Sequence, residues 1–179
     1  MRILHLTTEF PPVIYGGLGT AVGGLVKASA MAGMTVGVLL IGADTGAAYR
    51  RRAPLPQEAI STRVRRIAGA RIFAVSWFEG MEAVVQRAAR WRPDMLHLHS
   101  FWLWPIARAL RDRIGRPLVY TVHSLDRAEY KLGAGPPECV TQWIGQKAVI
   151  SGADRVIALT NRISRYIGEI SYARPISAL

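Results

Sequence analysis

The sequence has 179 residues, of which 50% are hydrophobic and 20% are charged. This composition excludes an intrinsically disordered chain and suffices for one sizeable domain. The net charge of +11 favours anionic ligands or surfaces. A solvated basic face, or an acidic second half of a larger protein, would account for the same balance. The single cysteine, Cys139, excludes an internal disulfide and suits a cytoplasmic protein.

The chain opens with an apolar run that predicts a buried strand over Ile3–Thr7. Pro11 and Pro12 follow, and they exclude both a helix and a central strand at that point. The loop then contains three glycines, which allow a ligand to approach the backbone closely: Gly16, Gly17 and Gly19. A glycine loop that leads into a helix directs unpaired N–H groups and the positive end of the helix dipole at one place, which predicts an anion site. A tight turn without a ligand is the alternative.

The residues from Ala21 to Ile41 are largely apolar, but we do not interpret them as a membrane span. The segment contains Lys27, and its periodicity changes near Gly33. Helical spacing before Gly33 predicts a helix, and Met34–Ile41 predicts a continuous buried strand. A strand, a helix and a strand joined so closely form a right-handed βαβ unit.

The stretch after this unit is rich in arginine. Gly42–Gln57 is loop-like, whereas Thr62–Ile67 and Arg71–Trp77 predict two strands that could form a hairpin. Between positions 50 and 66, Glu58 is the one acidic residue beside six arginines: Arg50, Arg51, Arg52, Arg63, Arg65 and Arg66. They form either an exposed flank or a patch that attracts acidic or phosphorylated ligands.

The rest of the chain alternates between predicted helices and strands. The helices are Glu79–Arg92, Trp102–Gly115, Val140–Ser151 and Asn161–Ile170, and the strands are Met95–His99, Leu118–His123 and Asp154–Leu159. This alternation predicts an α/β fold with a doubly wound parallel sheet of the Rossmann-like kind. Ser124–Pro137 is a polar connection, and connections of this length are often functional.

Polar residues fall where the predicted strands end. They are His99 with Ser100, His123 with Ser124, and Thr160. Ligands of doubly wound sheets bind at the carboxyl ends of the strands, where the glycine loop also lies. The sequence therefore predicts a single site at this edge.

The histidines divide into two groups. His5 and His97 lie inside predicted strands, where we expect packed and satisfied side chains. His97 and His99 share one face of a strand, and with His123 they could form a three-histidine zinc site. We do not favour that site, because His97 should lie about 7 Å below the end of the strand. A neutral His123 at its strand end can hydrogen-bond a substrate oxygen. Glu9, the acid of the first loop, could face a sugar or cap backbone N–H groups.

Four segments resemble the N-terminal domain of glycogen and starch synthases and their retaining glycosyltransferase relatives. The first reads Thr8-Glu9-Phe10-Pro11-Pro12, followed by Gly16-Gly17-Leu18-Gly19. The others are Arg92–Ser100, which is similar to the family's Pro-Asp-Val-Val-His-Ala-His-Asp, Leu118–Ser124, which contains Thr-Val-His, and Ser151–Thr160, which is similar to Ala-Asp-x-Val-x-Ala-Val-Ser. The four occur in the family's order across residues 2–166, and they are specific together rather than singly.

The resemblance implies the N-terminal half of a GT-B fold, in which two Rossmann-like domains enclose the active site. In the family, amides of the glycine loop approach the donor diphosphate, and the histidine that matches His123 contacts the transferred sugar. We therefore predict His123 as the catalytic residue. The predicted substrate-binding residues are Glu9, Tyr15, Gly16, Gly17, His99, Ser100, Ser124 and Thr160. No cofactor and no metal is expected.

Two positions depart from the family's pattern. Tyr15 stands where glycogen synthases carry a lysine before the glycines, and Ser100 stands where they carry an aspartate. Both departures weaken a strict glycogen synthase assignment and leave other hexosyl transfers open.

The resemblance also implies a domain organisation. Residues 1–170 would form the N-terminal domain, and residues 171–179 a tail that leads to a C-terminal domain. In the family, that second domain holds most of the donor site. We therefore expect this chain to be an incomplete half that binds weakly and is inactive alone.

The leading hypothesis is the acceptor-side domain of a retaining glycosyltransferase. The complete enzyme would transfer a hexose from a nucleotide sugar such as ADP- or UDP-glucose to a glycan or small acceptor. One alternative is a dinucleotide-dependent oxidoreductase, because Gly17-x-Gly19 and Asp44 imitate the Rossmann fingerprint, although about eight residues separate the strand from its glycines. Another is a non-enzymatic basic module that binds anions. Specific nucleic-acid binding is not expected, because the Arg50–Arg66 stretch contains no aromatic residue.

Overall fold

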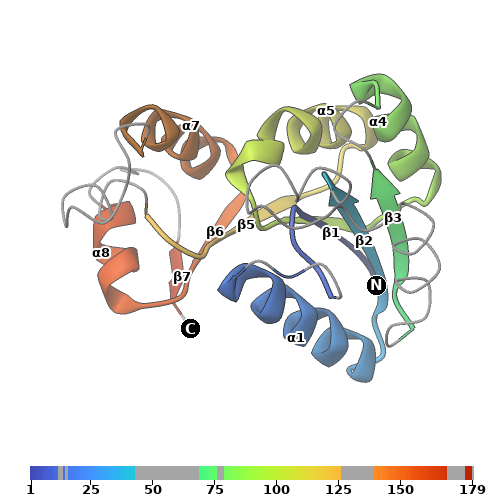
Figure 1. Cartoon of the computed structure of the whole chain (residues 1–179), viewed down its shortest axis with the longest axis horizontal. Coiled ribbons are helices and arrows are strands. Elements are labelled where there is room, and N and C mark those ends of the chain that lie inside the picture. Colours follow the sequence, from blue (N-terminus) through green and yellow to red (C-terminus); the bar gives the residue numbers. More distant parts are fainter. Residues whose placement is uncertain are drawn as a thin grey trace. The chain divides into compact units, whose positions relative to one another are not determined.

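The structure is a computed structural model that describes residues 1–11, 14, 16–42, 69–75, 79–125, 139–168 and 176–178. The chain divides into two compact units, Met1–Pro117 and Leu118–Leu179. Both units combine parallel strands with helices (Figure 1). Each unit is therefore an α/β structure, as the alternation of elements predicts.

The first unit is built on parallel strands. They are β1 (Arg2–Thr7), β2 (Thr35–Ile41), β3 (Arg71–Val75) and β4 (Met95–Leu98). Their spatial order is β3-β2-β1-β4, and each neighbouring pair runs parallel. In the register of β1 against β4, His5 lies opposite His97. β1 is therefore a central strand that pairs with β2 on one side and with β4 on the other.

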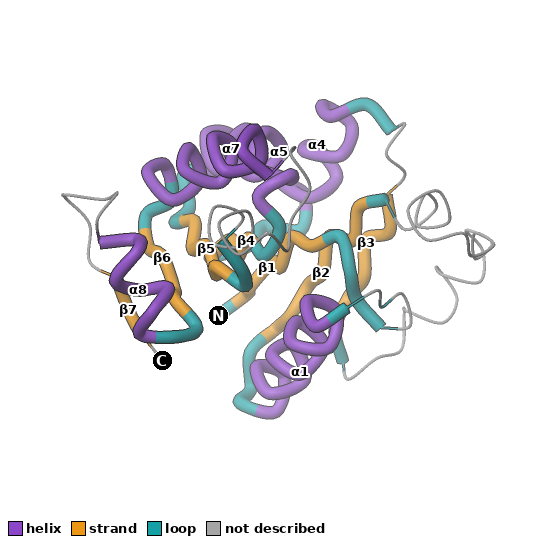
Figure 2. The backbone as a smooth tube through the Cα atoms, turned by 60° about the vertical axis from the view of Figure 1, so that its left-hand side comes forward, coloured by secondary structure: helices purple, strands orange, loops and turns teal. Residues whose placement is uncertain are grey.

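The helices of the first unit cover both faces of these strands. They are α1 (Gly17–Met31), α4 (Met81–Arg90) and α5 (Trp104–Ile114), the last preceded by the 3-10 turn η1 (Phe101–Leu103). α1 lies on one face, and α4 and α5 lie together on the other (Figures 1 and 2). Pro105 occupies the first turn of α5, where its missing N–H costs no hydrogen bond. Gly115 ends α5 in the left-handed region at φ 62°.

The core of this unit explains why its elements form where they do. β1 and β2 are buried almost throughout, as expected for strands covered on both faces. Val22 and Val26, one turn apart on α1, pack with Phe10 against the strand residues Val38 and Leu40. Each such side chain contributes about 1.5–3 kcal/mol when it is fully buried. On α4 the buried face consists of Val84, Val85 and Ala88, whereas Met81 at the start of the helix is 50% exposed.

The second unit contains β5 (Leu118–Val122), β6 (Arg155–Ala158) and β7 (Ile176–Ala178), which pair in parallel in that order. Its helices are α7 (Cys139–Gly152) and α8 (Asn161–Gly168). Asp154 joins the starts of β5 and β6: its carboxylate accepts the Leu118 N–H at 2.8 Å, and its own N–H donates to the Leu118 carbonyl at 2.8 Å. This reciprocal pair fixes the register of the two strands.

The predicted elements are confirmed wherever the structure describes them. The predicted strand Thr62–Ile67, its hairpin, the arginines between 50 and 66 and most of the Ser124–Pro137 connection lie outside the described residues. β7 falls in the segment that the sequence analysis assigned only as a tail. The apolar stretch from Ala21 to Ile41 forms most of α1, a turn and β2. Across the described parts of the chain, none of the helices has the length and apolar character to cross a membrane.

Candidate functional site

The loop after β1 is anchored before it reaches the glycines. Thr7 and Phe10 are fully buried, so the chain is fixed on both sides of Glu9. The Thr7 hydroxyl donates to the Glu9 carbonyl at 2.9 Å and accepts the Glu9 N–H at 3.2 Å. This turn at the carboxyl end of the strand holds the backbone of Glu9 in one orientation.

The side chain of Glu9 occupies the N-terminus of α1. Its Oε2 accepts the Gly16 N–H at 2.9 Å and the Gly19 N–H at 3.3 Å. The first turn of α1 contains no acidic residue, and Gly16 has no side chain with which to cap it. Glu9 therefore supplies both the missing acceptor and the negative charge that the helix dipole favours. Of the two roles considered for Glu9, capping of backbone N–H groups is the one that the structure confirms.

The glycines of the loop serve different purposes. A Cβ on Gly19 would lie 3.2 Å from Glu9 Cβ, from Glu9 Oε2 and from Ile14 Cγ1, so a side chain here would require these neighbours to shift. A Cβ on Gly16 or Gly17 would meet nothing within 4 Å. Of the three loop glycines, only Gly19 is closely packed, and Gly16 and Gly17 are exposed. Tyr15, another predicted substrate-binding residue, lies outside the described residues.

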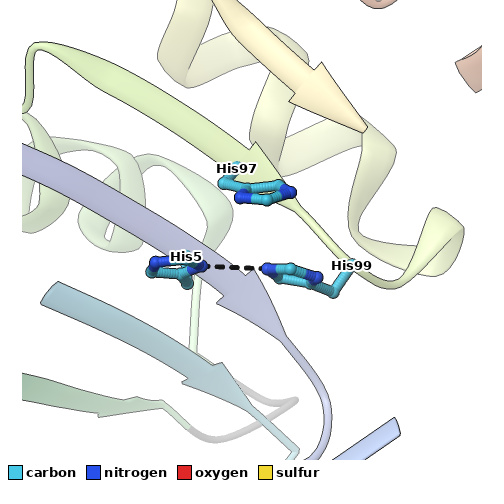
Figure 3. A group of neighbouring side chains, drawn as sticks. All are labelled: His5, His97 and His99. Carbon is cyan, nitrogen blue, oxygen red and sulfur yellow. Dashed lines mark hydrogen bonds between the residues drawn. The ribbon is translucent and has the colours of Figure 1, made fainter. Parts of the chain in front are cut away.

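Three buried histidines gather at the junction of β1 and β4. His5 lies on β1, His97 on β4, and His99 directly after β4 (Figure 3). The ring centroids of His97 and His99 are 4.2 Å apart. The ring centroid of His5 lies 5.1 Å from that of His97 and 5.2 Å from that of His99. Nδ1 of His5 and Nε2 of His99 form a hydrogen bond of 2.9 Å, in which the donor depends on the tautomers. Parallel pairing of β1 and β4 brings the three rings together.

The buried position of His5 changes its acid–base behaviour. Its exposed fraction is 1%, and burial lowers the pKa of its imidazole from the ordinary 6.5 to about 4. His5 is therefore neutral at physiological pH. Its Nε2 is buried and has no hydrogen-bond partner among the described residues. We expected packed and satisfied side chains at His5 and His97, and this nitrogen of His5 is an exception.

His99 and Ser100, two predicted substrate-binding residues, follow β4 and are both buried. The N–H of His99 donates to the Leu6 carbonyl at 3.0 Å, which extends the pairing with β1 by one residue. The Ser100 carbonyl accepts the Leu103 N–H at 3.1 Å at the start of the 3-10 turn. His99 thus presents its side chain to His5 rather than to bulk solvent.

The remaining predicted residues belong to the second unit. His123 directly follows β5 and is half-buried, and the next residue, Ser124, is exposed. The Ser124 carbonyl accepts a hydrogen bond of 2.8 Å from the amide of buried Gln146 on α7. The Thr160 hydroxyl caps α8 by accepting the Ile163 N–H at 3.1 Å. Each residue lies after a strand, as predicted.

The predicted site residues therefore fall into separate groups. Glu9, Gly16 and Gly19 form one hydrogen-bonded loop, and His99 joins a cluster with His5 and His97. The predicted contact of His123 with the glycine loop would join the two units and stays a prediction. Sequence reasoning missed His5 as a neighbour of His99. The pairing of β1 with β4 would have revealed it, because His5 lies opposite His97 in that register and His99 follows two residues later.

Comparisons with known proteins identify relatives of this chain. Residues 16–177 match the family described as the glycosyl transferase 4-like domain. A glycogen synthase of Mycobacterium tuberculosis is 32% identical over 148 residues, which cover 73% of this chain and 35% of that protein. A D-inositol 3-phosphate glycosyltransferase of Rhodococcus erythropolis is 29% identical over 141 residues, which cover 69% of this chain and 30% of that protein. The chain thus spans about a third of the length of these curated relatives.

Solved structures share the fold. The sucrose-phosphate synthase of Thermosynechococcus elongatus aligns with a TM-score of 0.68 and 17% identity, over 99% of this chain and 47% of that one. HepE of Anabaena, solved in complex with UDP and glucose, aligns with a TM-score of 0.63 and 15% identity, over 100% of this chain and 44% of that one. These likenesses confirm the predicted fold class, a Rossmann-like N-terminal half of a GT-B fold.

Proposed function

This chain belongs to the glycosyl transferase 4-like family, and we propose that it is the acceptor-side domain of a retaining glycosyltransferase. The complete enzyme transfers a hexose from a nucleotide sugar, such as UDP- or ADP-glucose, to a glycan or small acceptor. The relative named glycogen synthase supports glucose as the sugar, and HepE, solved with UDP-glucose, supports a nucleotide-sugar donor. The family assignment favours this function over the oxidoreductase and the non-enzymatic basic module.

The observation that carries the proposal is that the glycine loop binds a negatively charged oxygen through its backbone N–H groups. Two of its N–H groups, those of Gly16 and Gly19, already converge on a negatively charged oxygen of Glu9. Such convergence, added to the positive end of the α1 dipole, is the electrostatic environment that stabilises a phosphate. Gly16 and Gly17 are exposed and a Cβ there would meet nothing within 4 Å, so a donor diphosphate reaches the loop from this side and displaces Glu9 from the Gly16 amide.

The proposed mechanism uses the loop and His123 for different parts of the donor. Amides at Gly16 and Gly17 stabilise the negative charge that grows on the departing diphosphate. His123 donates or accepts a hydrogen bond at the transferred sugar, and Ser124 and Thr160 line the same edge. His99 and Ser100 support the acceptor side. A C-terminal domain supplies the remaining donor contacts, and the single Cys139 supports a cytoplasmic location.

The test is a sugar-transfer assay on the complete enzyme with His123→Ala. Loss of a hydrogen bond made at the reacting sugar lowers kcat by about 100-fold or more. Arg108→Ala, on the exposed surface of α5, is the matched control and keeps the wild-type rate. Wild-type transfer by His123→Ala, with either UDP-glucose or ADP-glucose, would contradict the role given to His123.

A further inference from the structure

The three-histidine cluster is not used by the proposed function as a group. Its members, His5, His97 and His99, have exposed fractions of 1%, 6% and 3%. We infer that these three side chains form a binding site for a divalent transition metal of the Zn²⁺ class, with one imidazole nitrogen from each ring as ligand. The inference stands independently of sugar transfer.

The geometry of the cluster matches such a site. One nitrogen of each ring lies within 4.8 Å of those of the other two, and one pair of nitrogens is only 2.9 Å apart. In tetrahedral zinc sites the metal lies about 2.0–2.1 Å from each nitrogen, which separates the nitrogens by about 3.3 Å. Small rotations of the rings therefore convert the observed cluster into a ligand set. Figure 3 shows the three rings facing one another across the strands.

The backbone that carries the ligands is fixed before any metal binds. His5 and His97 lie opposite each other in the parallel register of β1 and β4. His99 is held by the hydrogen bond from its N–H to the Leu6 carbonyl. Ligands on paired strands of a packed core lose little conformational entropy on binding, so the site is pre-organised.

The cluster is not explained by packing alone. Nδ1 of His5 and Nε2 of His99 face each other at 2.9 Å, and imidazole nitrogens so directed can also act as metal ligands. Nε2 of His5 is buried without a hydrogen-bond partner among the described residues, which is rare in native proteins. The ligand chemistry then selects the metal. Three imidazoles suit Zn²⁺, Co²⁺, Ni²⁺ or Cu²⁺, whereas Mg²⁺ and Ca²⁺ require oxygen ligands. With three neutral ligands the fourth position is left to water, hydroxide or an oxyanion, which balances the charge of the metal.

The experiment is a titration of the untagged, chelator-treated chain with Co²⁺, followed by competition between Zn²⁺ and a chromophoric chelator. We expect one equivalent of Co²⁺ to bind with the intense visible absorption of a four-coordinate site, and Zn²⁺ to displace it. If the wild-type chain gives no such band and does not compete with the chelator for Zn²⁺, the inference is wrong. This first measurement needs no variant.

Variants then identify the ligands. His97→Gln and His5→Gln are each expected to weaken metal binding at least 100-fold, with circular dichroism confirming that they fold. His123→Gln, which removes the histidine outside the cluster, is the matched control and keeps wild-type affinity. Equal loss in His123→Gln, or wild-type affinity in both cluster variants, would overturn the assignment. If the cluster variants do not fold, the histidine side-chain NMR resonances of the wild-type chain are followed as Zn²⁺ is added. Shifts or broadening at His5, His97 and His99 support the metal site, and shifts confined to other residues overturn it.

Discussion

Oε2 of Glu9 lies 2.9 Å from the backbone nitrogen of Gly16, at the point where α1 begins. A second hydrogen bond of 3.3 Å, from the Gly19 N–H, reaches the same oxygen. The loop proposed to bind the donor phosphate therefore already binds an anion that belongs to the chain. Glu9 stabilises the helix start, and it also competes with any phosphate for these amides.

Replacement of Glu9 separates these two effects. Glu9→Ala removes both hydrogen bonds and the favourable charge at the helix N-terminus, so the free energy of unfolding should fall by about 1–2 kcal/mol. Anion affinity should rise in the same variant, because the internal competitor is gone. Urea denaturation measures the first effect and titration with UDP the second. Glu82→Gln, an exposed change on α4, serves as control and should alter the free energy of unfolding by less than about 0.5 kcal/mol. A variant that loses both stability and UDP affinity would show that Glu9 helps the ligand rather than competing with it.

Alanine substitutions at the glycines distinguish packing from ligand access. Gly19→Ala should lower the free energy of unfolding by about 1–3 kcal/mol, because its Cβ would crowd Glu9 and Ile14 at 3.2 Å. Gly17→Ala meets nothing within 4 Å and should leave stability unchanged or raise it, since alanine favours a helix. The same Gly17→Ala should weaken nucleotide-sugar binding, because the methyl group lies on the open backbone. Thermal denaturation and calorimetric titration of both variants measure these effects, and the reverse ranking of stability would refute the packing argument.

Gln146 controls the segment that carries His123. Its buried amide donates to the Ser124 carbonyl at 2.8 Å and reaches the Tyr120 hydroxyl at 3.4 Å. Gln146→Leu removes the hydrogen bond to the Ser124 carbonyl and should lower the free energy of unfolding by about 0.5–1.5 kcal/mol. In the complete enzyme Gln146→Leu should also lower kcat, because His123 directly precedes the Ser124 carbonyl that Gln146 holds. Lys147→Leu, on the exposed side of the same helix, should change neither quantity. Unchanged stability of Gln146→Leu would remove Gln146 as the anchor of this segment.

The buried His5 makes the stability of the metal-free chain depend on pH. Burial lowers the pKa of His5 from 6.5 to about 4, so the unfolded chain binds a proton more readily than the folded one. The contribution of neutral His5 to the free energy of unfolding is therefore fully present above pH 6.5, and it is lost as the pH falls from 6.5 to about 4. The loss at the acid end is on the order of 3 kcal/mol. Urea denaturation in the presence of a chelator should show this decline in the wild type and a flatter profile in His5→Gln. Parallel pH profiles for the two chains would contradict it.

Much of the fold could be predicted because its signals are local. Continuous apolar runs such as Leu118–Val122 predict strands buried on both faces, and glycine or proline marks the helix ends, as at Gly115 and Pro105. β7 was not assigned, because a strand of three residues, Ile176–Ala178, has too few positions for a periodic pattern.

The candidate site was less predictable, because its contacts depend on strand pairing and on loop geometry. The sequence places His97 and His99 on one face, but only the pairing of β1 with β4 adds His5 to them. Likewise Glu9 and Gly16 lie seven positions apart, and the hydrogen bond between them depends on how the intervening loop folds. Sequence spacing left the two roles of Glu9 equally open for this reason.

The most direct test of the account is a two-dimensional ¹H–¹⁵N NMR titration of this chain with UDP-glucose and ADP-glucose. We predict that the amide resonances of Gly16 and Gly17 shift progressively with ligand concentration, and that inorganic diphosphate shifts the same resonances. Glucose alone should leave them in place. If saturating nucleotide sugar and diphosphate leave Gly16 and Gly17 unmoved while resonances elsewhere shift, the glycine loop is not the phosphate site and the proposed function loses its support.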